Sequence, residues 1–406
     1  MIMLIKLAWK NIWRNKKRSI IITLAALFGI WGGVFTNGVF VGMWETTIEA
    51  AIGRELSHIQ IHHKKFRDEK LITQFISNID SVERVINSVN YVQNYSRRTI
   101  IEGMASSPIS VSGVKIVAIN PQKEKLISSI HQKLIEGIYF SDKEYEILIG
   151  KRLAEKLKLK INSKIVLSFQ GLDNNLITSA FRVAGIFKSE SKLFDETNVF
   201  IKQNDLQNIL GTTIPIHEIA IRVSSSNLID TTTSILKSEL KDLSVENWKE
   251  LAPELSLTSG FLFLELNIFI GIILFSLLFA ISNTMMMSVF ERIREFGVLI
   301  SIGMKRIKLF SLIIFETIIL LFSGGLLGTL FAFLTIELLS KKGIDLSIFE
   351  QGMAAYGMSA VLYPELPFHM YVSLFVMMIF TAIVASISPA IKAIRLKPAE
   401  AIRTYM

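Results

Sequence analysis

Four stretches of the chain are apolar for long enough to cross a lipid bilayer. A transmembrane helix needs about 20 apolar residues. Three of the stretches contain no Asp, Glu, Lys or Arg, and the fourth has one acid, Glu316; they span 19–44, 266–290, 366–391 and 309–336. Buried helices of a soluble protein are the alternative, but four stretches of this length argue against it. The pattern therefore predicts a membrane protein with four spans.

The first apolar stretch follows basic residues, which is also the pattern of a secretory signal peptide. Its apolar core exceeds the roughly 7–15 residues typical of such peptides, and no pair of small residues forms a cleavage site at its end. Trp44 and Glu45 follow it directly. We therefore expect a retained transmembrane helix.

Lys and Arg are distributed unevenly around the four stretches. Segments 1–18, 291–308 and 392–406 are rich in them, whereas 338–369 balances two lysines with acids. Short basic segments stay on the cytoplasmic side of a membrane. We therefore expect both termini in the cytoplasm, and we attribute the net charge of +9 to this topology rather than to nucleic-acid binding.

The polar region between the first two spans shows both strand and helix periodicity. The fold predicted is an α-helical membrane protein with four transmembrane helices, arranged one plus three, and a large inserted extracytoplasmic α+β domain. The expected parts are an amphipathic cytoplasmic helix at 1–18, spans at 19–44, 265–290, 309–337 and 370–391, the inserted domain at 45–264, a cytoplasmic helix and loop at 291–308, an external loop at 338–369 and a cytoplasmic tail at 392–406.

Residues with catalytic or metal-binding chemistry do not form a recognisable pattern. The chain has no cysteine, so thiolate sites and disulfides are excluded. Its Gly150-Lys151 pair lacks the glycine and the Ser or Thr of a phosphate-binding loop. His62 and His63 are adjacent, and neighbouring side chains of a strand point to opposite faces; we interpret them as a solvated pair. We predict no catalytic site, no metal site and no cofactor bound by this chain.

The segment after the second span, residues 288–306, has helical periodicity of its own. Apolar residues recur every three or four positions, and charged residues fill the other side. This predicts a short amphipathic helix at the cytoplasmic surface, ended by Gly303. It is either an interfacial helix that only anchors the turn or a lever that docks on a protein partner. The charged residues are Glu291, Arg292, Arg294 and Glu295.

The sequence ERIREFGVLISIG at 291–303 resembles the coupling helix of the permeases grouped with MacB, FtsX, LolC and LolE, the mechanotransmission class of ABC transporters. Further segments resemble the same family along the whole chain: its amphipathic N-terminus, pieces of its periplasmic domain, and its C-terminal end. They are 7–19, 134–137, 146–157, 183–187 and 388–403.

The resemblance implies a non-catalytic subunit in the bacterial inner membrane. Two copies of a separate ATPase, carrying ATP and Mg²⁺, would bind the coupling helix, and a second permease copy or a paralogue would pair around the first two spans. The external domain would be a porter-like α+β subdomain interrupted near 136–212 by a smaller β-rich one. The residues implied in ATPase coupling are Glu291, Arg292, Arg294, Glu295, Phe296, Gly297 and Gly303.

Two segments, 54–62 and 343–353, look like those of LolE-type permeases and favour release of lipoproteins, with a periplasmic carrier as a further partner. A MacB-like exporter of peptides or small molecules and an FtsX-like regulator of a cell-wall hydrolase are the alternatives. Acyl chains of a lipoprotein would need an apolar cavity in the outer halves of the first two spans, among membrane lipids. The candidates are Val34, Phe35, Val39, Phe40, Met43, Phe263, Leu266 and Phe269.

Polar and small residues inside the spans have two kinds of expected role. Glu316 lies near the basic end of the third span, and we interpret it as snorkelling to the cytoplasmic interface; a contact that transmits helix motion is the alternative. Asn283 is expected to hydrogen-bond across a helix interface. Gly324 and Gly328 form a small-x-x-x-small pair that permits close helix packing.

Overall fold

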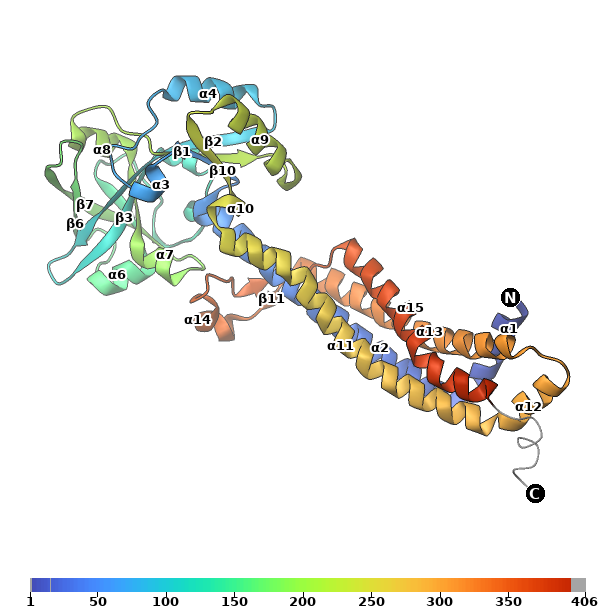
Figure 1. The fold of residues 1–406 in the computed structure, drawn as a ribbon. Coiled ribbons are helices and arrows are strands. Elements are labelled where there is room, and N and C mark those ends of the chain that lie inside the picture. The colour runs from blue at the N-terminus through green and yellow to red at the C-terminus, as the bar shows by residue number, and fades with distance from the viewer. Residues whose placement is uncertain (1, 15, 396–406) are drawn as a thin grey trace. The chain divides into compact units, whose positions relative to one another are not determined.

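The structure is a computed structural model that describes residues 2–14 and 16–395 (Figure 1). The chain divides into two compact units. The helical unit contains residues 1–44, 259–344 and 362–406, and the α+β unit contains residues 45–258 and 345–361. Each unit is described by itself below.

Within the described residues, four helices are long and apolar enough to cross a membrane. They extend past the apolar stretches, because helical backbone hydrogen bonding continues into the polar residues at their ends. The first, for example, continues beyond Ala51 as the π-helix η1 (Ile52–Leu56). The helices that lie wholly or mainly in the helical unit are α1 (Ile2–Arg14), α2 (Lys16–Ala51), α11 (Pro253–Glu291), α12 (Ile293–Ser301), α13 (Arg306–Lys342) and α15 (Phe368–Ile394).

Glycines bring α13 close to α2 in the helical unit. A Cβ atom added at Gly324 would lie 2.3 Å from the carbonyl oxygen of Thr23, and one added at Gly328 would lie 2.6 Å from that of Leu27. Both glycines therefore stand where two helix backbones meet. The surrounding core consists of apolar side chains from α2, α11, α13 and α15, including Ile30, Ile281, Leu321 and Met378.

The α+β unit is built on one mixed sheet, in the order β10-β1-β9-β2-β3-β8-β5-β7-β4, with β6 bridging β2 and β7. Its strands are β1 (Ile59–His63), β2 (Val92–Ser106), β3 (Val111–Ile119), β4 (Leu134–Gly137), β5 (Glu146–Gly150), β6 (Lys164–Gln170), β7 (Leu176–Phe187), β8 (Asn198–Lys202), β9 (Glu218–Val223) and β10 (Leu243–Asn247). Because β6 joins both β2 and β7, the strands β2, β3, β8, β5, β7 and β6 close into a barrel.

Short helices complete the unit. Two of them, α4 and α9, pack on β1, β9 and β10 around Ile61, Ile86 and Leu236. The helical segments of this unit are α3 (Phe66–Glu69), α4 (Ile79–Ser88), α5 (Pro121–Glu124), η2 (Ile130–Gln132), α6 (Lys151–Leu157), α7 (Lys192–Thr197), α8 (Gln203–Leu210), η3 (Ser226–Leu228), α9 (Ile229–Glu239), α10 (Trp248–Leu251), η4 (Ser347–Phe349) and α14 (Glu350–Met353). The remaining strands, β11 (Ile344–Asp345) and β12 (Val361–Leu362), pair with each other.

The long strand β2 belongs to both parts of the sheet. Its first half pairs with β9, with Arg98 opposite Glu218, and its second half pairs with β6, with Gly103 opposite Phe169. The barrel therefore includes β3 and the end of β2, and it begins earlier in the chain than the inner subdomain expected at 136–212. The difference arises because strands distant in sequence close the barrel, and local periodicity does not report such pairing.

Replacing Gly324 by Ala should destabilise the helical unit by about 1–3 kcal/mol, since the added methyl group forces α13 away from α2. The free energy of unfolding in detergent micelles measures this loss. Gly32→Ala is the matched control, because nothing lies within 4 Å of a Cβ at that position and alanine favours a helix over glycine. A Gly324→Ala protein as stable as the wild type would contradict the close approach.

Candidate functional site

The expected coupling segment forms a turn and a short helix at the basic end of the helical unit. The helix α11 ends at Glu291, Arg292 forms the turn, and α12 follows. Gly303 then adopts a φ of 97°, a left-handed conformation that glycine enters without steric cost. The N–H of Met304 donates to the carbonyl oxygen of Leu299 at 3.0 Å, which ends the helix.

Arg292 reaches from this turn to a carboxylate inside the helical unit. Its Nη1 lies 3.0 and 3.1 Å from the two carboxylate oxygens of Glu316 on α13. Both side chains are buried, with 7% and 5% of their surfaces exposed. The side-chain amide of Asn11 on α1 also donates to Glu316. The expectation that Glu316 snorkels to the interface is therefore wrong, because a partner 24 residues away satisfies its charge inside the protein.

A second set of ion pairs joins the end of α11 and the start of α12 to the N-terminal helices. Arg14 donates to Glu295 at 2.8 Å, and Arg18 donates to both oxygens of Glu291. Partial burial would raise the pKa of Glu295, but hydrogen bonds from Arg14 and Arg292 outweigh it and hold that pKa below its ordinary value. These pairs are largely exposed, so each adds little stability.

The two sides of α12 have different surroundings. Phe296 is 1% exposed and packs in the core of the helical unit, with its ring 4.8 Å from the Arg292 guanidinium. Gly297 is also buried. On the other side, Arg294 is exposed, as are Val298 and, after the helix, Ile302, the last with 78% of its surface. The structure thus separates the expected coupling residues into buried and exposed ones.

The residues expected to line a substrate cavity do not share one environment. Val34 and Leu266 are buried. Phe40, Phe263 and Phe269 are exposed, and the remaining three, Phe35, Val39 and Met43, are partly buried. The set is divided between the interior and the surface of this chain.

Asn283 is exposed on α11. A hydrogen bond from its amide across a helix interface would therefore need a partner from another chain.

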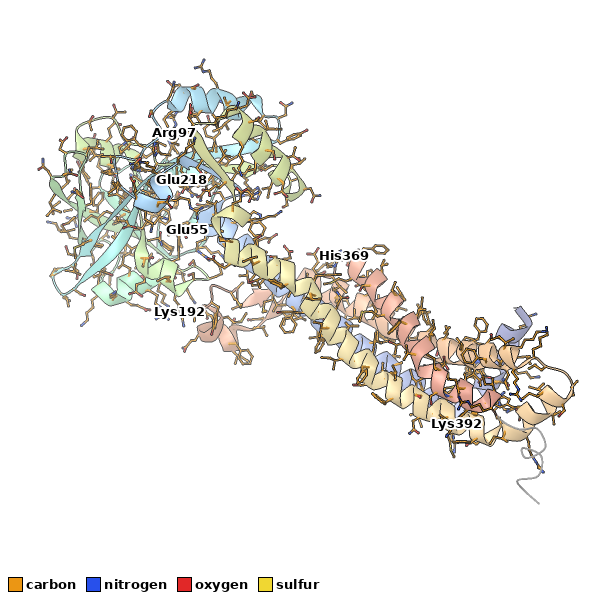
Figure 2. The ribbon with its side chains drawn as sticks, in the orientation of Figure 1. Glu55, Arg97, Lys192, Glu218, His369 and Lys392 are labelled. Atoms are coloured by element: carbon orange, nitrogen blue, oxygen red, sulfur yellow. The ribbon has the colours of Figure 1, made fainter. Side chains whose placement is uncertain are left out.

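The α+β unit contains a charge network that sequence reasoning missed. Its centre at Arg98 is buried, whereas the side chains of its Lys115–Glu55 pair are 32% and 38% exposed. Arg98 is buried on β2 and donates to the carboxylates of Glu124 and Glu218, while Lys115 pairs with Glu55 at 2.6 Å. Glu55 and Glu218 are labelled in Figure 2. The only local signal of this network in the sequence is Arg98 itself, an arginine in the middle of a strand. Its partners Glu124 and Glu218 lie 26 and 120 residues away along the chain.

His62 is part of the same region. Its side chain is 2% exposed and its Nε2 lies 2.9 Å from the amide oxygen of Gln60. Burial lowers the pKa of His62 to about 4. The interpretation of His62 and His63 as a solvated pair is therefore wrong for His62, because both faces of β1 are covered at that point.

Comparison with known proteins identifies the family. Residues 267–398 match the FtsX-like permease C-terminal family, and residues 19–238, more than half of the chain, match the MacB-like periplasmic core domain. The chain is a permease of the MacB/FtsX/LolC family of ABC transporters. The α+β unit therefore corresponds to a MacB-like domain, and α11 to α15 correspond to the FtsX-like part.

Individual relatives are distant. An uncharacterized ABC transporter permease of Methanocaldococcus jannaschii is 26% identical over 218 residues, which cover 50% of this chain and 51% of that protein. The lipoprotein-releasing system transmembrane protein LolC of Buchnera aphidicola subsp. Schizaphis graminum is 23% identical over 344 residues, 81% of each chain. This chain thus spans about half the length of the first relative.

The solved structures that are similar to part of this chain include the periplasmic region of MacB from Actinobacillus actinomycetemcomitans. It is 15% identical with a TM-score of 0.35, covering 50% of this chain and 93% of that one. The extracellular domain of the ABC-type transporter YknZ from Gram-positive bacteria is 14% identical with a TM-score of 0.34. The match covers 47% of this chain and 99% of that domain.

Replacing Glu316 by Leu should destabilise the helical unit by about 3–5 kcal/mol, because it removes the buried counter-ion of the Arg292 Nη1 group and leaves only the largely exposed Glu295 to pair with the guanidinium. The double variant Arg292→Met/Glu316→Leu should recover much of the loss. Unfolding in detergent micelles measures both. Glu337→Leu on the same helix is the control, since its ion pair with Lys341 is exposed. Equal stability of the Glu316→Leu and Glu337→Leu proteins would refute the role of the buried pair.

Proposed function

We propose that this permease transmits the motion of a separate ATPase subunit, which binds ATP and Mg²⁺, to its α+β unit outside the cytoplasm. The two-sided environment of α12 carries the proposal. Its inner side is buried and held by Arg292, whereas its outer side exposes Arg294, Val298 and Ile302. A short helix that is fixed on one side and exposes apolar residues next to a cation on the other is suited to dock in a groove of a partner protein.

The residues expected at the ATPase interface take two roles in this proposal. Phe296 and Gly297 are buried within the chain, so they position α12 and do not touch the partner. Glu291 and Glu295 form ion pairs with arginines of α1 and α2, so they also hold α12 in place. Arg294 and Gly303 are the remaining exposed residues of the coupling set. Gly303 ends the segment, and Arg294, with the exposed Val298 and Ile302, is proposed to meet the ATPase.

The orientation in the membrane follows from charge. The segments at the α12 end of the helical unit are rich in Lys and Arg, which the positive-inside rule assigns to the cytoplasm. In the proposed topology both termini are cytoplasmic, and the α+β unit lies on the outer side of a bacterial inner membrane.

A second permease copy or a paralogue is part of the proposed complex. Large apolar side chains recur every three or four residues along one exposed stripe of α11, from Leu257 to Phe279. Asn283 continues this stripe and is also exposed. An amide in contact with lipid is costly, and hydrogen bonds between helices remove that cost. The stripe therefore favours a partner helix over lipid alone.

Lipoproteins are the proposed substrate. The relative LolC, named as part of a lipoprotein-releasing system, is similar over 81% of each chain. The exposed rings of Phe40, Phe263 and Phe269 offer apolar contact to an acyl chain. A periplasmic carrier would then receive the released lipoprotein. Export of peptides or small molecules, as by MacB, and control of a cell-wall hydrolase, as by FtsX-like proteins, are the competing functions.

Replacing Val298 by Asp should weaken binding of the cognate ATPase at least about tenfold, since it places a charge in the apolar contact. Binding is measured with the full-length permease in nanodiscs, together with stimulation of ATP hydrolysis. Leu176→Asp, an equally drastic change at an exposed apolar residue of β7 in the α+β unit, should leave both unchanged. Wild-type binding by the Val298→Asp permease would contradict docking through this side of α12.

Depletion of the permease should leave outer-membrane lipoproteins in the inner membrane, because their extraction is the step that it performs. Membrane fractionation followed by detection of lipoproteins measures this, and re-expression of the wild-type chain is the control. Normal sorting after depletion rules out lipoprotein release. Co-purification of a cell-wall hydrolase with the α+β unit would then support the regulatory function.

A further inference from the structure

The segment that links α13 to α15, residues 345–361, belongs to the α+β unit. It contacts the start of α7 through three interactions. The backbone N–H of Lys192 donates to the carbonyl oxygen of Ala354 at 3.2 Å, and the Lys192 ammonium donates to the carbonyl oxygen of Gln351. Lys188 forms an ion pair with Glu350. Lys192 is labelled in Figure 2.

The surface that receives this segment, residues 188–195, is held by the α+β unit itself. The backbone N–H of Ser189 donates to the carboxylate of Asp195 at 3.0 Å, and the Ser191 hydroxyl accepts the N–H of Phe194 at the start of α7. Phe194 is buried against Phe187 and Phe200 of the barrel. The receiving surface therefore does not need the 345–361 segment for its own shape.

The same surface also meets the end of α2. The guanidinium of Arg54 on η1 lies 5.4 Å from the ring centroid of Phe194. The next residue, Glu55, pairs with Lys115, and its carbonyl oxygen accepts a hydrogen bond from the buried Arg98 at 3.0 Å. The backbone N–H of Ser129 donates to the carbonyl oxygen of Gly53 at 2.7 Å. Two segments from different spans thus converge on one part of the α+β unit.

The two attachments differ in burial. The side chain of Arg98, which holds η1, is 6% exposed, so its hydrogen bonds are shielded from water and strong. The Lys188 and Glu350 side chains are 40% and 41% exposed, and exposed ion pairs stabilise little and are screened by salt. The large apolar side chains Ile348 and Tyr356 are 92% and 80% exposed, so they add little burial to the attachment. The 345–361 segment is the weaker of the two attachments.

We infer that the 345–361 segment is a releasable clasp. It is docked on residues 188–195 in the present structure, and it detaches when α13 and α15 move during the ATP cycle, whereas η1 stays attached. The ATP-driven release rests on the proposed function. The weak docking itself is a property of the permease alone, and the two are tested separately.

A disulfide between positions 191 and 357 tests the clasp. A Cβ added at Gly357 would lie 3.8 Å from the Cβ of Ser191, which is close to the mean Cβ separation of about 3.8 Å in disulfides. The chain has no other cysteine, so the variant Ser191→Cys/Gly357→Cys contains only this pair. Gly357 has a φ of 72°, and the oxidised and reduced forms of one variant carry the same backbone strain, so they serve as controls for each other.

In the permease alone, an added oxidant should form the disulfide rapidly. Adding Lys188→Glu should slow its formation about fivefold through loss of the ion pair, and the swapped pair Lys188→Glu/Glu350→Lys should restore the rate. Raising NaCl to about 1 M should slow it too. No disulfide would overturn docking, and a rate unaffected by both charge and salt would overturn the weak attachment. Lys237→Glu, which removes an equally exposed ion pair between α9 and α10, should leave the rate unchanged.

In the complex with the ATPase, oxidation should lower stimulated ATP hydrolysis at least about fivefold, and reduction of the same sample should restore it. Full stimulation with the clasp locked would overturn release. A wild-type permease that neither binds nor stimulates the ATPase would instead contradict the proposed function, and the experiments on the permease alone would still decide whether the clasp docks and opens.

Discussion

The buried ion pair between Arg292 and Glu316 is the contact on which the proposed coupling geometry depends. A carboxylate inside an apolar helix is destabilising unless a cation and further donors satisfy it. Arg292 and Asn11 supply them, one from the turn before α12 and one from α1. Three segments that are far apart in the chain therefore meet at one carboxylate. The turn before α12 cannot be displaced without breaking this pair, which makes its position a property of the whole helical unit.

This constraint decides which side of α12 is available to a partner. Arg292 and Phe296 are one helical turn apart and lie together, with the guanidinium over the ring. Burial of this pair turns residues 294 and 298 outward, because they lie on the opposite side of the helix. The exposed pairs Arg14–Glu295 and Arg18–Glu291 reinforce the arrangement more weakly. In the proposed function the residues of the family motif therefore take two roles: the buried ones fix the helix, and the exposed ones bind the partner.

The sequence predicted the features that depend on composition and local periodicity. Four apolar stretches predicted the four long helices, and the family resemblance is confirmed by the matches to FtsX-like and MacB-like domains. The errors concern charged or polar residues whose partners are remote in the chain. Glu316 has its partner on another segment, and His62 is covered from both sides of a sheet. The closure of the barrel by β6, and the docking of residues 345–361, likewise depend on pairing over long distances in sequence.

The α+β unit shows the same physical distinction between a strong and a weak attachment. At η1, Arg98 donates to the backbone of Glu55 and to carboxylates of α5 and β9, so a displacement of α2 reaches several elements of the sheet at once. These groups are buried, and breaking one bond would leave a charge without a partner, which is costly. At the 345–361 segment the interacting side chains are exposed, and water replaces the lost partner. In the proposed cycle, burial therefore determines which attachment transmits the motion and which one is released.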